Sequence, residues 1–266
     1  MRLSVIVTTY NRPEALIRVL DGLRRQHCLP DEVIVADDGS GPATADAIGT
    51  FIGETPYPLY HVWQPDTGFR AAAIRNKAIR RAQGDYILLL DGDCIPSPRF
   101  VDDHLRLAEA GHFFQGHRIL VSRRLTPAFE ADRITRAWRL WLDWLGGHLG
   151  NGHHLVRLTA WPARRFQKLG GIRSCNMGLF TEDLYAVNGF NEDFVGWGRE
   201  DSELAVRLFR FGLHRKSHPF MAVCFHLWHA EHDRSRLAAN DDRLQQQLAA
   251  DGFTCANGLV RRDAGP

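Results

Sequence analysis

Two aspartates separated by one residue, Asp91 and Asp93 in the stretch DGDC, are the first side chains that could do chemistry. Residues i and i+2 of an extended chain point the same way, so both carboxylates are expected to project together. Paired carboxylates suit a hard divalent cation that shares its ligands with phosphate oxygens. A solvated turn is the alternative. The apolar run YILLL directly before DGDC favours the metal site, because ligands bind beyond the carboxyl ends of buried parallel strands.

Two further stretches carry groups that could bind a nucleotide. In DDGS, Asp37 and Asp38 could accept hydrogen bonds from a base or a ribose hydroxyl, and an ordinary Asp-Gly turn is the alternative. In FRAAAIRNKA, Arg70, Arg75 and Asn76 lie at or near an expected helix start. Guanidinium groups and a helix N-terminus both favour phosphate, and a solvated basic face is the alternative there.

The stretch GFNEDFVGWGREDSEL combines an aromatic side chain with two acids. Trp197 is flanked by Gly196 and Gly198, which predicts a tight turn that presents the indole face, and Glu200 and Asp201 open a helix. An indole can stack on the apolar face of a sugar, and a carboxylate beside it could take a proton from a hydroxyl. Acidic capping of the helix is the alternative, and it explains one acid but not the tryptophan between glycines.

Histidines are concentrated in CFHLWHAEH, where His226, His229 and His232 follow an expected strand. One of them could complete the metal site that the aspartates begin. A zinc site that includes Cys224 is an alternative, although the spacing matches no standard zinc pattern. Partly buried histidines without a metal are the other interpretation.

The elements that must position these groups alternate between strand and helix in the first half of the chain. Apolar strands separated by helices, such as the helix expected at 70–82, indicate a parallel sheet that is covered on both faces. The polar clusters TTYNR, DDGS and DGDC end three of the strands and would therefore lie at one edge. The sequence thus predicts an α/β fold with a Rossmann-like, mostly parallel central sheet. The expected strands are 3–8, 32–36, 59–62 and 86–90.

The second half is less regular. An amphipathic helix is expected at 128–145, carrying Trp138, Trp141 and Trp144. Further elements follow at the end of this half: a strand in SCNMGLF, a helix at 200–211, a strand at 221–226 and a polar helix after 235. We expect one domain over 1–266 in three parts, which are 1–120, 121–234 and a helical tail at 235–266.

Composition excludes several classes of protein. The 266 residues include 44% hydrophobic and 24% charged side chains, which excludes a disordered chain, and the net charge of +2 gives no reason to expect nucleic acid as a partner. Five scattered cysteines without a C-x-x-C indicate reduced thiols and a cytoplasmic protein. No apolar run reaches the length of a membrane span. The basic, tryptophan-rich segment 128–168 leaves open an acceptor lid, a peripheral contact with the membrane or tryptophans packed in the core.

Taken together, four motifs resemble those of family 2 glycosyltransferases with the GT-A fold, and the resemblance covers roughly 3–229. The last motif is similar to the carboxyl-terminal segment of β-1,4-galactosyltransferases, polypeptide N-acetylgalactosaminyltransferases and bacterial chondroitin-type polymerases. This chain has Arg199 where many relatives have a second glycine. The four motifs are SVIVTTYNRP, VIVADDGS, RNKAIRRAQGDYILLLDGDC and NGFNEDFVGWGREDSELAVRL.

The resemblance implies roles for individual residues. Asp91 and Asp93 would hold Mn2+ or Mg2+ on the diphosphate of a nucleotide sugar, with His229 as third ligand and His226 as the alternative. Asp201 would be the catalytic base, with Glu200 as the alternative. Trp197, Gly198 and Asn176 would lie beside the sugar or the acceptor. The expected nucleotide site comprises Thr8, Tyr10, Arg12, Asp37, Asp38, Arg70, Arg75, Asn76, Asp91 and Gly92.

The implied activity is an inverting, metal-dependent transfer of a hexose or N-acetylhexosamine from a nucleotide sugar, preferably a UDP-sugar. The acceptor would be a hydroxyl of a glycan or lipid-linked glycan in bacterial surface polysaccharide or lipopolysaccharide synthesis. A nucleotidyltransferase is an alternative that gives no role to Trp197. An inactive sugar-binding module on the same fold is another, and the intact D-x-D argues against it.

Overall fold

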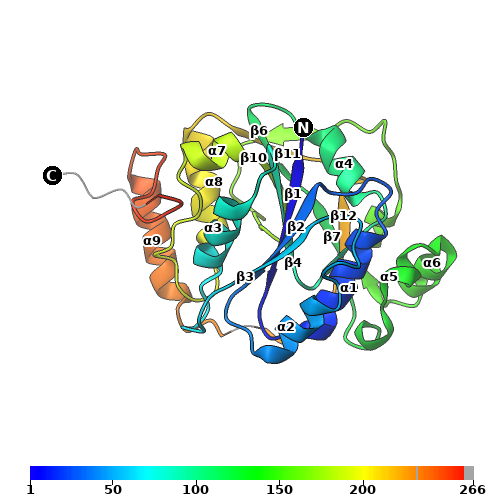
Figure 1. The fold of residues 1–266 in the computed structure, drawn as a ribbon. Helices are drawn as coiled ribbons and strands as arrows, with labels where there is room; N and C mark the ends of the chain where they lie inside the picture. The colour runs from blue at the N-terminus through cyan, green and yellow to red at the C-terminus, as the bar shows by residue number, and fades with distance from the viewer. Residues whose placement is uncertain (232, 261–266) are drawn as a thin grey trace.

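The computed structural model describes residues 1–231 and 233–260, and two sheets form its centre (Figure 1). Within these residues the large sheet has eight strands and the small sheet four. The large sheet runs in the order β3 (Leu59–Trp63), β2 (Glu32–Asp37), β1 (Leu3–Thr9), β4 (Tyr86–Asp91), β10 (Asn176–Phe180), β6 (His112–Gln115), β11 (His214–Ser217) and β9 (Arg164–Phe166). The small sheet runs β5 (Cys94–Pro96), β12 (Val223–His226), β7 (His117–Val121) and β8 (Leu149–Gly150).

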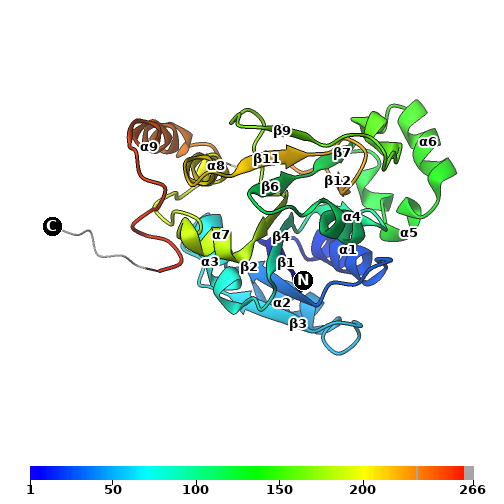
Figure 2. The same ribbon diagram turned by 90° about the horizontal axis from the view of Figure 1, so that it is seen from above.

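Helices flank the large sheet on both faces (Figure 2). The described α-helices are α1 (Pro13–Arg24), α2 (Pro42–Gly49), α3 (Ala71–Arg81), α4 (Phe100–Leu107), α5 (Ala131–Ile134), α6 (Ala137–Leu145), α7 (Thr181–Ala186), α8 (Glu200–Arg210) and α9 (Leu237–Ala249). Short 3-10 turns lie at η1 (Thr126–Ala128) and η2 (Gly152–Leu155). The α/β class with a large central sheet between helices is confirmed.

The parallel half of the sheet brings the polar strand ends to one edge. β3, β2, β1 and β4 pair in parallel, as expected from their apolar runs. Thr8 is in register with Asp91, and Thr9 is in register with Asp37. The carboxyl ends of three strands are therefore level, and the loops that follow them meet at the same edge.

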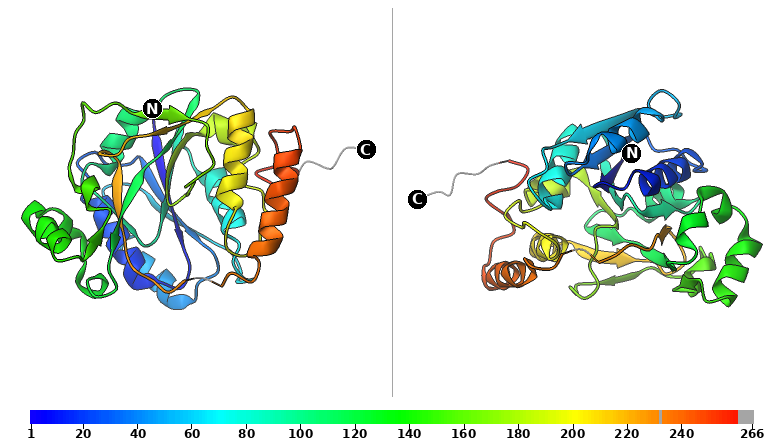
Figure 3. Two further views of the ribbon diagram at one scale, coloured as in Figure 1. Left: turned by 180° about the vertical axis from the view of Figure 1, so that it is seen from behind. Right: turned by 90° about the horizontal axis from the view of Figure 1, so that it is seen from below.

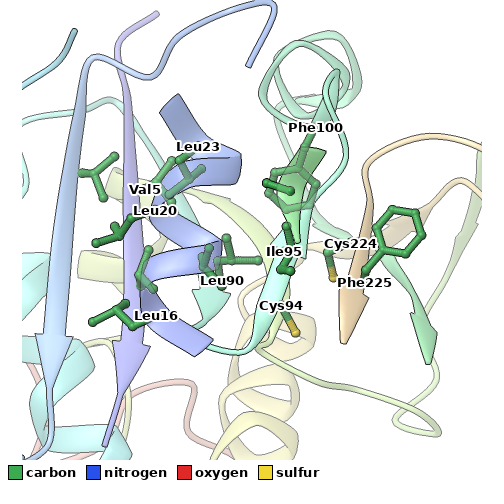
Figure 4. Packing of buried hydrophobic residues seen from close by; sticks show 14 of the residues in the cluster. Val5, Leu16, Leu20, Leu23, Leu90, Cys94, Ile95, Phe100, Cys224 and Phe225 are labelled. Atoms are coloured by element: carbon green, nitrogen blue, oxygen red, sulfur yellow. The ribbon is translucent and has the colours of Figure 1, made fainter. Parts of the chain in front are cut away.

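Alternating side chains of the buried strands feed two separate cores. Val5 and Val7 of β1 belong to the cluster shared with α1, α4 and the small sheet, whereas Ile6 belongs to the cluster shared with α3, α7 and α8. Figure 4 shows the first cluster, where Leu16 and Leu20 of α1 lie against the sheet. Both faces of β1 are buried, which explains why its sequence is apolar throughout instead of alternating.

The second half departs from the prediction in two places. β10 runs antiparallel to β4 and β6, so the parallel order of the first four strands stops there. The helix expected at 128–145 is divided into α5 and α6. Trp138, Trp141 and Trp144 are exposed, so the interpretation of these tryptophans as core is wrong. α6 lies at one end of the molecule (Figure 2), and of its apolar side chains Leu140 is buried in the core.

α8 is fixed by a buried ion pair. Arg207 and Glu203 are one turn apart, both are fully buried, and two N–H groups of the guanidinium meet both carboxylate oxygens. Arg207 also donates to the carbonyl oxygens of Val187 and Gly189. This network ties α8 to the loop after α7 and thereby fixes the first turn of α8, where Glu200 lies.

We expect Arg207→Met to lower the free energy of unfolding by about 3–5 kcal/mol, because it leaves the Glu203 carboxylate buried without its cation. The matched control is Arg106→Met on α4, which breaks an exposed ion pair of the same spacing with Asp102. That control is expected to cost within about 0.5 kcal/mol. Urea unfolding measures both variants, and equal costs would contradict a structural role for the buried pair.

Candidate active site

A cavity of about 700 Å³ opens at the edge where the parallel strands end. Its wall combines the loop after β1, the end of β4, the start of α8 and the segment after β12. The predicted residues that line it are Thr8, Tyr10, Arg12, Asp38, Arg75, Asp91, Gly92, Asp93, Trp197, Gly198, Glu200, Asp201, His226 and His229. In the described part of the chain, the predicted residues outside the lining are Asp37, Arg70, Asn76 and Asn176.

One carboxylate and two imidazoles form a candidate metal centre. Ligand atoms of Asp93, His226 and His229 all lie within 4.8 Å of one another. Asp93 Oδ1 is 3.7 Å from His226 Nε2, and Asp93 Oδ2 is 3.4 Å from His229 Nε2. The donor set fits a divalent cation. Both histidines that the sequence left as alternatives are in the cluster, whereas Cys224 is not, and His232 lies outside the described residues.

Strand pairing explains how this cluster forms. β12 pairs antiparallel with β5, and His226 is in register with Cys94, the residue after Asp93. The N–H of Leu227 donates to the carbonyl oxygen of Asp93, which extends the pairing by one bond. Residues more than 130 positions apart are thus brought together by backbone hydrogen bonds, so the cluster does not depend on side-chain attraction alone.

The charge state of the cluster suits a metal ion. Burial lowers the pKa of His226 to about 4, which outweighs the attraction of the nearby Asp93 carboxylate. The imidazole is therefore neutral at neutral pH, and the neutral form is the one that binds metals. Asp93 also accepts a hydrogen bond of 2.6 Å from Arg12, whose guanidinium neutralises it in this structure.

Asp91 has a different set of neighbours from Asp93. Asp91 is the last residue of β4 and faces Arg75, whose guanidinium nitrogen lies 3.4 Å from Asp91 Oδ1. Burial raises the pKa of Asp91 to about 6, and the Arg75 charge opposes that rise. The described metal cluster does not include Asp91. A direct contact between Asp91 and the metal stays a prediction.

Arg75 joins the two sides of the cavity. It lies in the first half of α3, its side chain is 6% exposed, and its guanidinium contacts three elements. It donates to Thr8 Oγ1 at 3.3 Å, to Asp91 Oδ1 at 3.4 Å and to Glu200 Oε1 at 3.1 Å. The end of β1, the end of β4 and the start of α8 are therefore held by one buried positive charge.

The two candidate bases have unequal environments. Glu200 is buried, and burial together with the charge of Asp201 raises its pKa to about 7. Among the described residues Glu200 Oε2 has no hydrogen-bond partner. Asp201 is the second residue of α8, and its Oδ2 accepts a hydrogen bond of 3.0 Å from the N–H of Ser174. Both carboxylates line the cavity.

Asp38 and Asp37 are separated by the end of β2. Asp38 lines the cavity and accepts hydrogen bonds from Gln64 Nε2 at 2.6 Å and the Arg70 N–H at 2.7 Å. Burial raises the pKa of Asp38, against the effect of these two donors. Asp37 is 1% exposed and accepts the Ser40 N–H, so it holds the turn instead of lining the cavity.

Two predicted asparagines serve the framework. Asn76 is fully buried and donates to the carbonyl oxygen of Phe190, and the Phe190 N–H donates back to its amide oxygen. Asn176 is 1% exposed and donates to the carbonyl oxygens of His117 and Ala222. Both join separate elements behind the cavity. A direct contact of either asparagine with a ligand stays a prediction.

The Trp197 loop is shaped by glycine and by α9. Gly196 and Gly198 have φ angles of 83° and 101°, and a side chain on Gly196 would collide with Arg236. Arg199 also has a left-handed backbone, with φ of 79°, and its guanidinium pairs with Asp241 of α9. Arg199 thus reaches the tail helix from a position where many relatives have glycine.

Sequence reasoning missed three arginines of the cavity, Arg118, Arg173 and Arg234. Arg118 of β7 lines it, and no carboxylate in the described part of the chain forms an ion pair with this side chain. Arg234 also lines it, and its guanidinium carbon lies 4.9 Å from the centre of the Trp197 ring. Nothing in the surrounding letters, HRILV or HDRSR, distinguishes Arg118 or Arg234 from solvated arginines.

The raised pKa of Glu200 predicts a pH-dependent stability. The folded pKa of about 7 lies above the ordinary value of 4.5, so ionised Glu200 destabilises the fold. This penalty is absent at low pH, grows as pH rises above about 4.5 and is complete above about 7. Relative to Glu200→Gln, the wild-type free energy of unfolding should fall by about 2–3 kcal/mol between about pH 5 and pH 8. Urea unfolding measures it, with the exposed Glu54→Gln as control, and a pH-independent difference for Glu200→Gln would contradict the assignment.

Comparison with known proteins identifies the family of the chain. The description Glycosyl transferase family 2 matches residues 4–169, and N-terminal domain of galactosyltransferase matches residues 161–232. The chain is 29% identical over 243 residues to chondroitin synthase of Escherichia coli, covering 81% of this chain and 33% of that protein. It is 28% identical over 239 residues to validoxylamine A glucosyltransferase of Streptomyces hygroscopicus subsp. limoneus, covering 79% and 48%. The chain thus spans between a third and a half of these curated relatives.

Solved structures show the same fold. The mannosyltransferase PcManGT from Pyrobaculum calidifontis, in complex with GDP-Man and Mn2+, has a TM-score of 0.61 at 21% identity, covering 93% of this chain and 63% of that one. Residues 1–349 of TarS from S. aureus, in complex with UDP, have a TM-score of 0.65 at 16% identity, covering 93% and 65%. These likenesses confirm the expected GT-A fold. Because the family match covers more than half of its residues, this chain belongs to glycosyltransferase family 2.

Proposed function

We propose that the chain transfers a hexose or N-acetylhexosamine from a nucleotide sugar to a hydroxyl of a glycan, with inversion at the anomeric carbon. One observation supports this most strongly. One cavity is lined both by a candidate metal cluster and by two carboxylates. The cluster is Asp93, His226 and His229, and the carboxylates are those of Glu200 and Asp201. A leaving diphosphate needs the first group, and an attacking hydroxyl needs the second.

The donor is proposed to lie along the edge of the parallel strands. Asp38 is proposed to accept hydrogen bonds from the nucleotide base, because it lines the cavity at the end of β2. Arg118 is suited to a phosphate, since no carboxylate of the described chain pairs with it. A UDP-sugar is the preferred donor. TarS has been solved with UDP and with UDP-GlcNAc, and the mannosyltransferase with GDP-Man, so another nucleotide is an outcome of the test.

Mn2+ is the proposed metal, with Mg2+ as the alternative. Two of the three clustered ligands are imidazoles, and Mg2+ prefers a shell made of oxygen alone. When bound, a divalent cation would neutralise charge on the leaving diphosphate. Asp93, His226 and His229 would hold it, and the β5–β12 pairing would keep these ligands in place.

Asp201 is the proposed base, with Glu200 as the alternative. Glu200 Oε1 accepts a hydrogen bond from Arg75, and the Glu200 pKa of about 7 leaves this carboxyl partly protonated at neutral pH. Asp201 is held by one backbone N–H. The acceptor hydroxyl gives its proton to the carboxylate while its oxygen forms the new bond to the anomeric carbon. The bond from that carbon to the diphosphate oxygen breaks on the opposite face, which inverts the configuration.

The chain is proposed to divide its work by position. Residues 1–120 bind the donor, 121–234 supply the acceptor side and the base, and the tail from 235 supports the Trp197 loop. Asn240 of α9 donates to the carbonyl oxygens of Val195 and Gly198, which supports this role of the tail. The proposed acceptor is a glycan or lipid-linked glycan of bacterial surface polysaccharide or lipopolysaccharide synthesis, in a cytoplasmic setting. No nucleic-acid partner is proposed.

Calorimetry with UDP and Mn2+ tests the donor site. We expect UDP to bind only when Mn2+ is present, and Asp93→Asn to weaken that binding at least about tenfold, because a charged ligand is lost. The matched control Asp46→Asn, an exposed site on α2, should bind as the wild type does. Binding of UDP that ignores both Mn2+ and Asp93 would contradict the proposed metal centre.

Turnover of UDP-sugars by base variants tests the reaction itself. We expect Asp201→Asn to lower kcat by roughly 10²–10⁴-fold while UDP affinity is kept, because the base acts on the acceptor hydroxyl and not on the nucleotide. If Glu200→Gln lowers kcat and Asp201→Asn keeps full activity, Glu200 is the base instead of Asp201. Metal-dependent UDP binding without turnover of any sugar donor would favour a sugar-binding module, and transfer of a nucleotidyl group would favour a nucleotidyltransferase.

A further inference from the structure

α6 exposes most of its apolar side chains. Of its nine residues, Leu140 and Asp143 are buried. Leu145 is 75% exposed, Trp138 60% and Leu142 59%, and Trp141 and Trp144 are each 39% exposed. The helix stands at one end of the molecule, away from α8 and α9 (Figures 2 and 3). A helix with this much exposed apolar surface in a folded chain marks an interaction site.

The acids of α5 and α6 are paired with arginines, which leaves the charge of Arg139 on the α6 side. The acid on α6, Asp143, is buried and forms two hydrogen bonds of 2.6 and 2.7 Å with Arg133. Arg139 is half-buried, and its guanidinium carbon lies 5.1 Å from the centre of the Trp138 ring. The exposed Asp132 of α5 is in an ion pair with Arg136. The helix therefore offers apolar and cationic groups together.

We propose that the α6 face, defined as Trp138, Arg139, Trp141, Leu142, Trp144 and Leu145, docks the protein on the surface of a bilayer that contains anionic lipids. Tryptophan rings are favoured at the boundary between headgroups and acyl chains, because they are apolar and carry an N–H donor. Leucines reach further toward the acyl chains, and arginine pairs with lipid phosphate. No helix in the described ranges is both long enough and apolar enough to cross a bilayer, so the contact is interfacial.

Two other occupants fit the observations less well. A helix of nine residues is about 14 Å long and about 10 Å wide. Each partner in a standard protein interface contributes about 20–30 residues, whereas the α6 face has six, which disfavours a second copy of the chain. A glycan would use the indole faces, but the most exposed side chain is Leu145 and Leu142 is as exposed as Trp138, and neither leucine offers a sugar a hydrogen bond.

Docking through α6 would place lipid beside the acceptor half. α6 contacts β8, which pairs with β7, and Leu120 and Val121 of β7 line the cavity. α6 is therefore connected to the cavity through β8 and β7. The bilayer contact does not depend on the proposed reaction, and its failure would leave UDP binding unchanged.

Vesicle flotation of the full chain tests the proposal. Vesicles of phosphatidylcholine mixed with phosphatidylglycerol should bind the wild type, and phosphatidylcholine alone should bind it more weakly. The variant Trp138→Ser/Leu142→Ser/Leu145→Ser should need at least about tenfold more lipid for half-binding, because it lacks three apolar side chains that would be buried in the bilayer. The matched control Leu29→Ser/Ile52→Ser/Leu248→Ser removes exposed apolar side chains elsewhere and should bind as the wild type does.

Further readouts keep the proposal falsifiable. Circular dichroism and metal-dependent UDP binding should be unchanged in the triple variant, since α6 lies outside the cavity lining. The single variant Trp138→Ser should weaken vesicle binding in the same direction. Equal vesicle binding by the wild type and the triple variant, or no binding by the wild type, would overturn the proposal. A dimer in light scattering that the triple variant loses, without vesicle binding, would assign the α6 face to a second copy.

Discussion

The buried charge of Arg75 is the interaction on which the rest of the site depends. Its guanidinium contacts Thr8 at the end of β1, Asp91 at the end of β4 and Glu200 at the start of α8. Burying a cation is costly unless carboxylates offset it, and here two of them do so from different halves of the chain. The position of α8 relative to the parallel sheet is therefore set by electrostatics as well as by apolar packing.

The same arrangement separates the roles of neighbouring acids. Arg75 engages Asp91 and Glu200, whereas Asp93 lies with His226 and His229, and Asp201 is held by the Ser174 N–H. Acids that are close in sequence thus face different partners. A cavity that contains a metal-type ligand set and an acid of raised pKa can support both leaving-group and acceptor chemistry.

The sequence was sufficient to predict the parallel half of the fold, because strands buried on both faces are apolar throughout and end in polar loops. It could not tell which of Arg75 and Asn76 faces the cavity, since one residue along a helix turns the side chain by about 100°. Arg118 gave no signal, because its role follows from the pairing of β7 with β12. The tryptophans of α6 share the periodicity of a core helix, and only tertiary structure shows that they are exposed.

A double-mutant cycle between Arg75 and Glu200 tests the central claim most directly. The free energy of unfolding would be measured at about pH 8, where Glu200 is ionised, for the wild type, Arg75→Gln, Glu200→Gln and the double variant. The account predicts a coupling free energy of about 1–3 kcal/mol, because the two groups share one buried contact. The control cycle combines Glu200→Gln with Arg80→Gln, at a more exposed arginine of the same helix, and should give almost no coupling free energy. Additive effects of Arg75→Gln and Glu200→Gln would contradict the claim that this ion pair joins α8 to the sheet.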